Sequence, residues 1–176
     1  MSTQSIPVVV RNGTKTFTVL ENNPEVMTTL AHRLGKITGT QHRSKMPNQF
    51  TNLHSGLSKS VAFHDVYSLT EPEMLNLIPR PVYALLVILP LTPAWESNRL
   101  SEDRDKPDYI GKGPEEPVTW FKQTIGHACG SIGLLHCALN GEAARFIEKG
   151  SFLERLKEDV APLGMGEHYL NQTFRL

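Results

Sequence analysis

Eight apolar residues stand in a row at positions 82–89, VYALLVIL, and they limit the folds that this chain can adopt. Pro81 and Pro90 bound the run, and a proline cannot donate a hydrogen bond to a sheet. A continuous apolar run of this length, with several β-branched side chains, is typical of a strand buried on both faces. The sequence therefore predicts a central strand that other parts of the fold must cover.

Composition and charge exclude several classes of protein. The 176 residues, 39% of them hydrophobic, fit one domain, and the 18 basic side chains balance the 18 acidic ones. A balanced charge gives no indication of a nucleic-acid partner. No apolar stretch is long enough to span a membrane, and the N-terminus lacks the pattern of a secretory signal. We therefore expect a cytoplasmic protein without a membrane partner.

Two elements are predicted near the N-terminus. Residues 14–20 alternate polar and β-prone side chains, which favours a strand. Asn23 and Pro24 then suit the N-cap and the first position of a helix that ends near Gly35. Apolar residues recur at every fourth position of this helix and predict its buried stripe. They are Val26, Leu30 and Leu34.

The middle of the chain predicts a strand over residues 60–67, a short helix, and a polar loop over residues 92–117. Thr70 and Glu73 have the spacing of a capping box, which places the start of the short helix at Thr70. The apolar face of that helix is predicted to consist of Met74, Leu75 and Ile78.

Two further helices are predicted in the last third of the chain. The first begins near Cys129 and stops at Asn140-Gly141, with Ile132, Leu135 and Leu139 as its buried stripe. The second follows a capping box formed by Ser151 and Glu154 and cannot continue through Pro162. Its apolar residues are Phe152, Leu156 and Val160.

The chain has two cysteines, Cys129 and Cys137, whose α-carbons would lie roughly 12 Å apart in one helix, too far for a disulfide. Such thiols are usually inert core residues. Cys129 differs because it falls at the start of a helix, where free backbone N–H groups and the helix dipole stabilise a thiolate. Small neighbours leave room for a substrate, and Gln123, six residues earlier, supplies an amide that can stabilise an oxyanion. Cys129 is therefore the candidate nucleophile.

Three blocks of sequence carry a resemblance to a known family. QTIGHACGSIGLLH resembles the active-site segment of the ubiquitin C-terminal hydrolases, in which a glutamine precedes the nucleophilic cysteine by six positions and a histidine follows it by seven. NNPEVMTTLAHRLG and FHDVYSLTEPEMLNLIPRPVYALLVILPLT resemble the two preceding blocks of the same family, in the same order. The resemblance implies a papain-like α/β fold, with helices around a central antiparallel sheet and a knotted backbone.

The resemblance also implies a reaction and its residues. Cys129 would be the nucleophile, and Gln123 would donate to the oxyanion, together with the Cys129 backbone N–H. The substrate would be an amide, ester or thioester of the C-terminal glycine of ubiquitin, cleaved through a thioester acyl-enzyme. The family usually has asparagine where this chain has His127, which either distorts the loop and perturbs the thiol or is a tolerated surface substitution.

The family's general base is a histidine on a later strand, oriented by an aspartate, and we expect that this chain, which ends at Leu176, contains neither. Among the histidines present, His136 follows Cys129 by seven helical residues, roughly 10 Å, which is too far for a base. It is better interpreted as a structural core residue. The other six are not convincing substitutes: His32, His42, His54, His64, His127 and His168.

Residues 36–56 form a polar insert that interrupts the resemblance. Without them, HRLG continues directly into LSKSVAFHDVY at the spacing of the family. Gly35-Lys36 can be encoded with a GUAAG splice donor and Ser55-Gly56 with a terminal AG, so we interpret the insert as a retained intron. A genuine loop in a short isoform is the open alternative. The predicted organisation is a hydrolase domain over residues 14–167 and a divergent tail over residues 168–176.

Three functional hypotheses follow from the sequence. The first is a thiol-dependent deubiquitinase, monomeric and without a metal or other cofactor, whose partner is ubiquitin or a ubiquitin adduct. The second is a non-catalytic ubiquitin-binding fragment or truncated isoform. The third is a fragment that misfolds because its central strand leaves an apolar edge uncovered.

Overall fold

The computed structural model describes residues 9–11, 14–17, 19–20, 22–34, 56–107, 109–111 and 113–163. Most of the insert, the tail after residue 163 and three histidines (His42, His54 and His168) lie outside the described residues. The predictions about the tail, the knot and these histidines therefore stay predictions.

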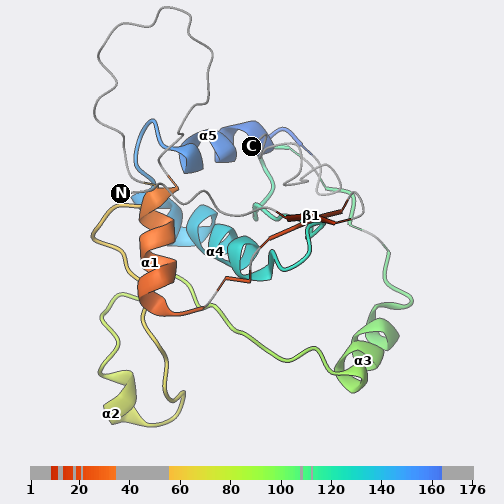
Figure 1. Ribbon diagram of the computed structural model, residues 1–176, viewed down its shortest axis with the longest axis horizontal. Helices are drawn as coiled ribbons and strands as arrows, with labels where there is room; N and C mark the ends of the chain where they lie inside the picture. The colour runs from red at the N-terminus through yellow and green to blue at the C-terminus, as the bar shows by residue number, and fades with distance from the viewer. Residues whose placement is uncertain are drawn as a thin grey trace, which may run out of the picture.

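The described chain is mainly helical (Figure 1). Its elements are β1 (Val9–Arg11), β2 (Thr14–Thr16), α1 (Pro24–Arg33), α2 (Pro72–Leu75), α3 (Pro93–Asp103), α4 (Cys129–Leu139), the 3₁₀ helix η1 (Gly141–Phe146) and α5 (Phe152–Val160). The two strands pair antiparallel, with Val9 opposite Thr16. Figure 1 shows α1, α4, α5 and the strands gathered together, whereas α2 and α3 lie apart from this group.

Helix α1 begins at its predicted cap. The Asn23 side chain accepts hydrogen bonds from the backbone N–H groups of Glu25 (2.9 Å) and Val26 (3.4 Å), and Pro24 occupies the first helical position. The predicted buried stripe is wrong at its first residue, because Val26 is 39% exposed. The residues fully buried are Met27 and Ala31, and Leu30 and Leu34 are only partly buried against the core.

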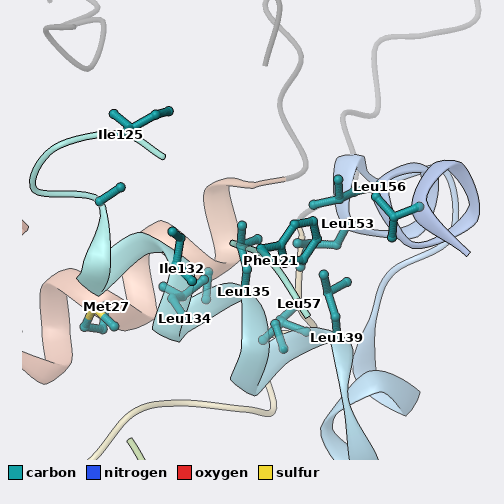
Figure 2. Packing of buried hydrophobic residues seen from close by; sticks show 14 residues of the cluster. Met27, Leu57, Phe121, Ile125, Ile132, Leu134, Leu135, Leu139, Leu153 and Leu156 are labelled. Atoms are coloured by element: carbon teal, nitrogen blue, oxygen red, sulfur yellow. The ribbon is translucent and has the colours of Figure 1, made fainter. Parts of the chain in front are cut away.

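Helix α4 lies at the centre of the core. Its predicted stripe is confirmed, since Ile132, Leu135 and Leu139 are all buried. Leu134 and Ala138 are buried as well, because α1 covers one side of the helix and α5 covers another. Figure 2 shows the leucines of α4 between Met27 of α1 and the two leucines Leu153 and Leu156 of α5. A helix covered on several sides is apolar nearly all round.

The capping box of α5 is confirmed, with one difference in its second bond. Ser151 Oγ accepts from the Glu154 N–H (3.1 Å), and Glu154 Oε2 accepts from the N–H of Gly150 (2.6 Å) rather than from that of Ser151. The helix stops at Val160, before Pro162.

The predicted central strand is not formed within the described chain. Residues 82–89 have no regular secondary structure, and Val87 and Ile88 are about 60% and 61% exposed. Only Tyr83 and Leu86 are partly buried, with the Tyr83 ring 4.7 Å from that of Phe146. A strand exists only when neighbours accept and donate its backbone hydrogen bonds, and no other described segment pairs with this one. The described strands therefore do not form the sheet that the sequence predicted.

The strand predicted over residues 60–67 is also wrong, and that over 14–20 is limited to β2. Side chains of α1 bind the 61–63 backbone in place of a second strand. His32 Nε2 lies 2.9 Å from the Val61 carbonyl oxygen, and the Phe63 N–H donates to Thr28 Oγ1 (2.8 Å). These bonds satisfy backbone groups that a sheet would otherwise satisfy.

Two predictions in the middle of the chain need correction. The N-cap of α2 is Glu71, not Thr70, and no described side chain caps this helix. Ser68 Oγ instead accepts from the N–H groups of Thr70 and Glu71 in the turn before the helix. The polar loop over 92–117 contains the helix α3, whose N-cap Thr92 accepts from the Trp95 N–H (3.2 Å). Its Thr-Pro start is a signal for a helix N-terminus, but the polar composition of the segment favoured the prediction of a loop.

The chain returns after the insert to the end of α1. The Gly56 N–H donates to the His32 carbonyl (2.8 Å) and the Leu57 N–H to the Ala31 carbonyl (3.1 Å). A Cβ atom on Gly56 would collide with the Ala31 carbonyl oxygen, so only glycine fits at this place. If residues 36–56 are removed, Gly35 follows Leu34 and precedes Leu57, so a glycine still stands there.

We expect deletion of residues 36–56 to leave the fold intact and to raise the free energy of unfolding by up to about 2 kcal/mol, because a shorter connection loses less entropy on closure. Urea unfolding followed by circular dichroism measures the change. The same deletion combined with Gly35→Ala is the matched control and should lose the gain. A deletion that unfolds the protein would contradict the expectation.

Within the described ranges, every helix is too short or too polar to cross a lipid bilayer.

Candidate active site

Cys129 is the first residue of α4, and its side chain is exposed as a free thiol. Ala128, which precedes it, has no side-chain oxygen to cap the helix, and the first intrahelical bond runs from the Ile132 N–H to the Ala128 carbonyl (2.9 Å). The N–H groups of Cys129 and of the next two residues have no acceptor among the described residues. This confirms the prediction that the buried helix begins at Cys129. The N–H groups at this N-terminus carry partial positive charge, which favours a negatively charged group next to them.

A tight turn over residues 125–128 precedes Cys129. It is closed by a hydrogen bond from the Ala128 N–H to the Ile125 carbonyl (3.4 Å), and its third residue, His127, has a φ of 60°. Glycine and asparagine adopt this left-handed conformation readily, whereas histidine does so less often. The His127 side chain is exposed and makes no hydrogen bond to Cys129 in the described structure. What distinguishes His127 is thus its backbone conformation.

We expect His127→Asn to raise the free energy of unfolding by roughly 0.5–1 kcal/mol, because asparagine relieves the strain of a positive φ. Urea unfolding measures this effect. Thr124→Asn, at an exposed position of the same loop, should change stability by less than about 0.5 kcal/mol. Equal gains from both substitutions would show that the turn is not the cause.

The N-terminal segment holds the turn and the start of α4. The Phe17 N–H donates to the Gly126 carbonyl (3.0 Å), and Thr16 forms a parallel bridge with the same residue. A Cβ atom on Gly130 would lie 3.2 Å from both Asn22 Oδ1 and Leu20 Cβ. The chain around Leu20 therefore passes close to the first turn of α4, and Gly130 permits this approach.

Gln123 lies on the loop before the turn and is exposed. Its Nε2 donates to the Ile125 carbonyl oxygen (3.3 Å), which is the same oxygen that accepts from Ala128. The structure thus ties Gln123 to the turn that leads into Cys129. An amide nitrogen carries two hydrogens, so one donor of Gln123 remains for another acceptor.

His136 is a structural residue, as predicted. Its Nε2 accepts from the Phe121 N–H (2.8 Å), and its ring stacks on those of Trp120 and Phe121, with centroids 6.3 and 6.0 Å away. Burial lowers the pKa of His136 below its ordinary value, which favours the neutral ring that can accept this bond.

Because the pKa of His136 is lower in the folded chain than the ordinary 6.5, the unfolded chain binds this proton at higher pH. The contribution to stability is therefore complete above about pH 6.5 and lost as the pH falls below it. Urea unfolding between about pH 5 and pH 7.5 should show this decline. In His136→Gln, whose side chain does not titrate, stability should decline less as the pH falls. A decline as steep as that of the parent chain would contradict its assignment to His136.

Asn140 does more than end the helix, which is the only role that the sequence predicted for it. Its Oδ1 accepts from the Thr119 N–H (2.7 Å), and its Nδ2 donates to the carbonyls of Thr119 and His136 (2.9 Å each). The available signal was the four-residue spacing of His136 and Asn140, which puts two polar side chains on one face of an apolar helix.

The second thiol is less available than the first. Cys137 is half-buried, and burial raises the pKa of its thiol, which disfavours the thiolate. Both cysteines are free, as their spacing predicted.

The described histidines have other roles or positions than that of a base for Cys129. His32 and His136 bind backbone groups, and His64 and His127 are exposed. In the part of the chain that the structure describes, no three metal-ligating side chains are grouped closely enough to hold a metal ion.

Comparison with known proteins identifies the family. The family model for "Ubiquitin carboxyl-terminal hydrolase, family 1" matches residues 45–173, which include Gln123 and Cys129. The chain is 33% identical over 135 residues to ubiquitin carboxyl-terminal hydrolase YUH1 of Saccharomyces cerevisiae, covering 77% of this chain and 44% of that protein. It is 37% identical over 98 residues to ubiquitin carboxyl-terminal hydrolase 3 of Arabidopsis thaliana, covering 56% and 40%.

A mammalian relative gives a similar result. Ubiquitin carboxyl-terminal hydrolase isozyme L1 of Rattus norvegicus is 34% identical over 108 residues, which is 61% of this chain and 47% of that protein. The chain spans less than half the length of these curated relatives. Because the family model matches well over half of its residues, the chain belongs to the ubiquitin carboxyl-terminal hydrolase family 1.

Proposed function

We propose that the protein to which this chain belongs is a cysteine-type deubiquitinase that hydrolyses amide, ester or thioester bonds at the C-terminal glycine of ubiquitin. The observation that carries the proposal is the exposed Cys129 thiol at the uncapped N-terminus of α4, in a chain of this family. The same proposal assigns it to the cytoplasm, as a monomer that needs no cofactor.

Cys129 supplies the nucleophile in this reaction. Its thiolate attacks the carbonyl carbon of the terminal glycine, and the carbonyl oxygen becomes an oxyanion. The Cys129 backbone N–H, which has no acceptor among the described residues, and the second N–H of the Gln123 amide stabilise that charge. The leaving group departs with a proton and leaves a thioester, which water hydrolyses to free ubiquitin and the thiol.

The proposal includes the expectation that none of the described histidines is the general base. A base must come within about 3 Å of the thiol or act through one water, and none of them makes a hydrogen bond to Cys129. Without a base at that distance, acylation of Cys129 by a ubiquitin C-terminal amide is expected to be slow.

Acyl transfer from an activated ubiquitin thioester tests the proposal on this chain. In this exchange the Cys129 thiolate displaces a thiolate leaving group, which needs no general base to protonate it, and a covalent ubiquitin adduct forms. Intact mass spectrometry should show one adduct, released by hydroxylamine, and Cys129→Ala should form none. Cys137→Ala is the matched control and should react like the parent chain.

Two results would overturn the proposal. An adduct that persists in Cys129→Ala would assign the chemistry elsewhere. Saturable binding of ubiquitin in calorimetry without any adduct would indicate the binding-only alternative.

A further inference from the structure

Two side chains at the C-terminal end of α4, one in its last turn and one at its C-cap, hold the backbone of the segment that leads to Gln123. Asn140 binds both the N–H and the carbonyl of Thr119, and His136 accepts from the N–H of Phe121. We call these four groups, the two side chains and the two backbone positions, the α4 clamp.

The α4 clamp joins two points of the helix end to two points of the neighbouring segment. His136 lies in the last turn of α4 and Asn140 is the C-cap, so about 6 Å of helix axis separates them. Thr119 and Phe121 are two residues apart in the chain, and the backbone groups of both bind this end of the helix. One helical turn therefore binds alternate residues of the segment and fixes its register along α4.

The imidazole in the α4 clamp is fixed in place and in tautomer. The rings of Trp120 and Phe121 lie nearly parallel to it, at 19° and 18°. Because Nε2 of His136 accepts a hydrogen bond, the proton of the neutral ring is on Nδ1.

Gln123 lies between two anchors. The α4 clamp holds the chain two residues before it, and the Ile125 carbonyl, two residues after it, accepts from its amide and from Ala128. The far anchor is the turn in front of Cys129. A shift of the segment along α4 would therefore move the Gln123 amide relative to the sulfur.

We propose that His136 and Asn140 are positioning residues that act through Gln123, by holding the 119–121 backbone in the register that keeps the Gln123 amide at the turn before Cys129. The proposal rests on the proposed function in assigning Gln123 to the oxyanion. The clamp itself is independent of that assignment.

A double-mutant cycle tests whether the effect passes through Gln123. The readout is the rate of ubiquitin acyl transfer to Cys129 in the full chain, for His136→Leu, Gln123→Ala and their combination. We expect His136→Leu to slow transfer about tenfold or more, since a small displacement of a positioned group is costly. We expect Gln123→Ala to slow it about 100-fold and the combination to be no slower than Gln123→Ala alone. Multiplied effects in the combination would overturn the proposal.

Two further variants separate positioning from stability. His136→Gln keeps an acceptor near the place of Nε2 and should restore transfer to within about threefold of the parent chain. Cys137→Ala, a neighbour on the same helix with similar burial, should leave the rate unchanged. A His136→Gln variant as slow as His136→Leu, or a Cys137→Ala variant equally slow, would overturn the proposal.

Hydrogen exchange at the Phe121 amide tests the clamp without any ubiquitin chemistry. Loss of the acceptor in His136→Leu should accelerate this exchange about tenfold, with amides of α5 unaffected. Unchanged protection of Phe121 would overturn the clamp. If the parent chain accepts no ubiquitin although iodoacetamide alkylates Cys129, the proposed function fails, and this exchange measurement alone decides the clamp.

Discussion

Gln123→Ala weakens the binding of a ubiquitin C-terminal aldehyde by about 100-fold, the expected effect of removing one oxyanion donor. The aldehyde and the Cys129 thiol form a hemithioacetal whose oxygen occupies the position of the oxyanion, so the measurement needs neither turnover nor a general base. The Gln123 amide is tied to the turn before Cys129 through the Ile125 carbonyl and retains one free N–H for this oxygen. The affinity is measured by competition between the unlabelled ubiquitin aldehyde and a fluorescently labelled one.

Lys122→Ala is the control for this substitution, because Lys122 is the exposed neighbour of Gln123 on the same loop. It should bind the aldehyde within about twofold of the parent chain. The rate of Cys129 alkylation by iodoacetamide should be the same in both variants, since the small reagent does not use the oxyanion donors. An aldehyde affinity that Gln123→Ala leaves unchanged would remove Gln123 from the site.

Leu153→Ala lowers the free energy of unfolding by about 2–5 kcal/mol. Leu153 on α5 is 0% exposed and packs, with Leu156 and Phe121, against α4 (Figure 2). Its truncation removes apolar contacts and leaves a cavity that the surrounding helices fill only in part. Because α5 is short, we expect its loss of packing to unfold the group of helices together.

Urea unfolding followed by far-ultraviolet circular dichroism measures this effect. Arg155→Ala, on the exposed face of the same helix, is the matched control and should change stability by less than about 0.5 kcal/mol. A Leu153→Ala loss as small as that of the control would show that α5 does not belong to the cooperative core.

The parts of the fold that the sequence predicted correctly are those with local causes. Asn23 before Pro24 and Ser151 before Glu154 place helix starts through short-range hydrogen bonds, and the structure has both caps. The start of α4 at Cys129 was predicted from another local signal, the helical spacing of Ile132, Leu135 and Leu139.

The parts that were wrong depend on distant residues. The run at 82–89 has the composition of a buried strand, but a strand needs backbone partners, and the described chain brings none beside it. Thr70 does not cap α2, because Ser68 Oγ binds the Thr70 and Glu71 N–H groups in a turn and the helix begins one residue later than predicted. The bond between Asn140 and Thr119 joins residues 21 apart, and no short motif predicts it.

The exposed side chains of the 82–89 run have a physical consequence. An unpaired apolar segment is the kind of edge that associates with other strands. This observation keeps open the hypothesis that the chain alone is prone to misfold, which the sequence analysis raised from the same residues.

The proposed function requires the sulfur of Cys129 to react with the tail of ubiquitin. The most direct measurement is peptide mapping by mass spectrometry after incubation with a ubiquitin that carries an electrophile in place of its terminal glycine. We expect a single covalent adduct on the peptide that contains Cys129, with Cys137 unmodified. An adduct on Cys137 or on no cysteine, in a chain whose Cys129 still reacts with iodoacetamide, would contradict the account.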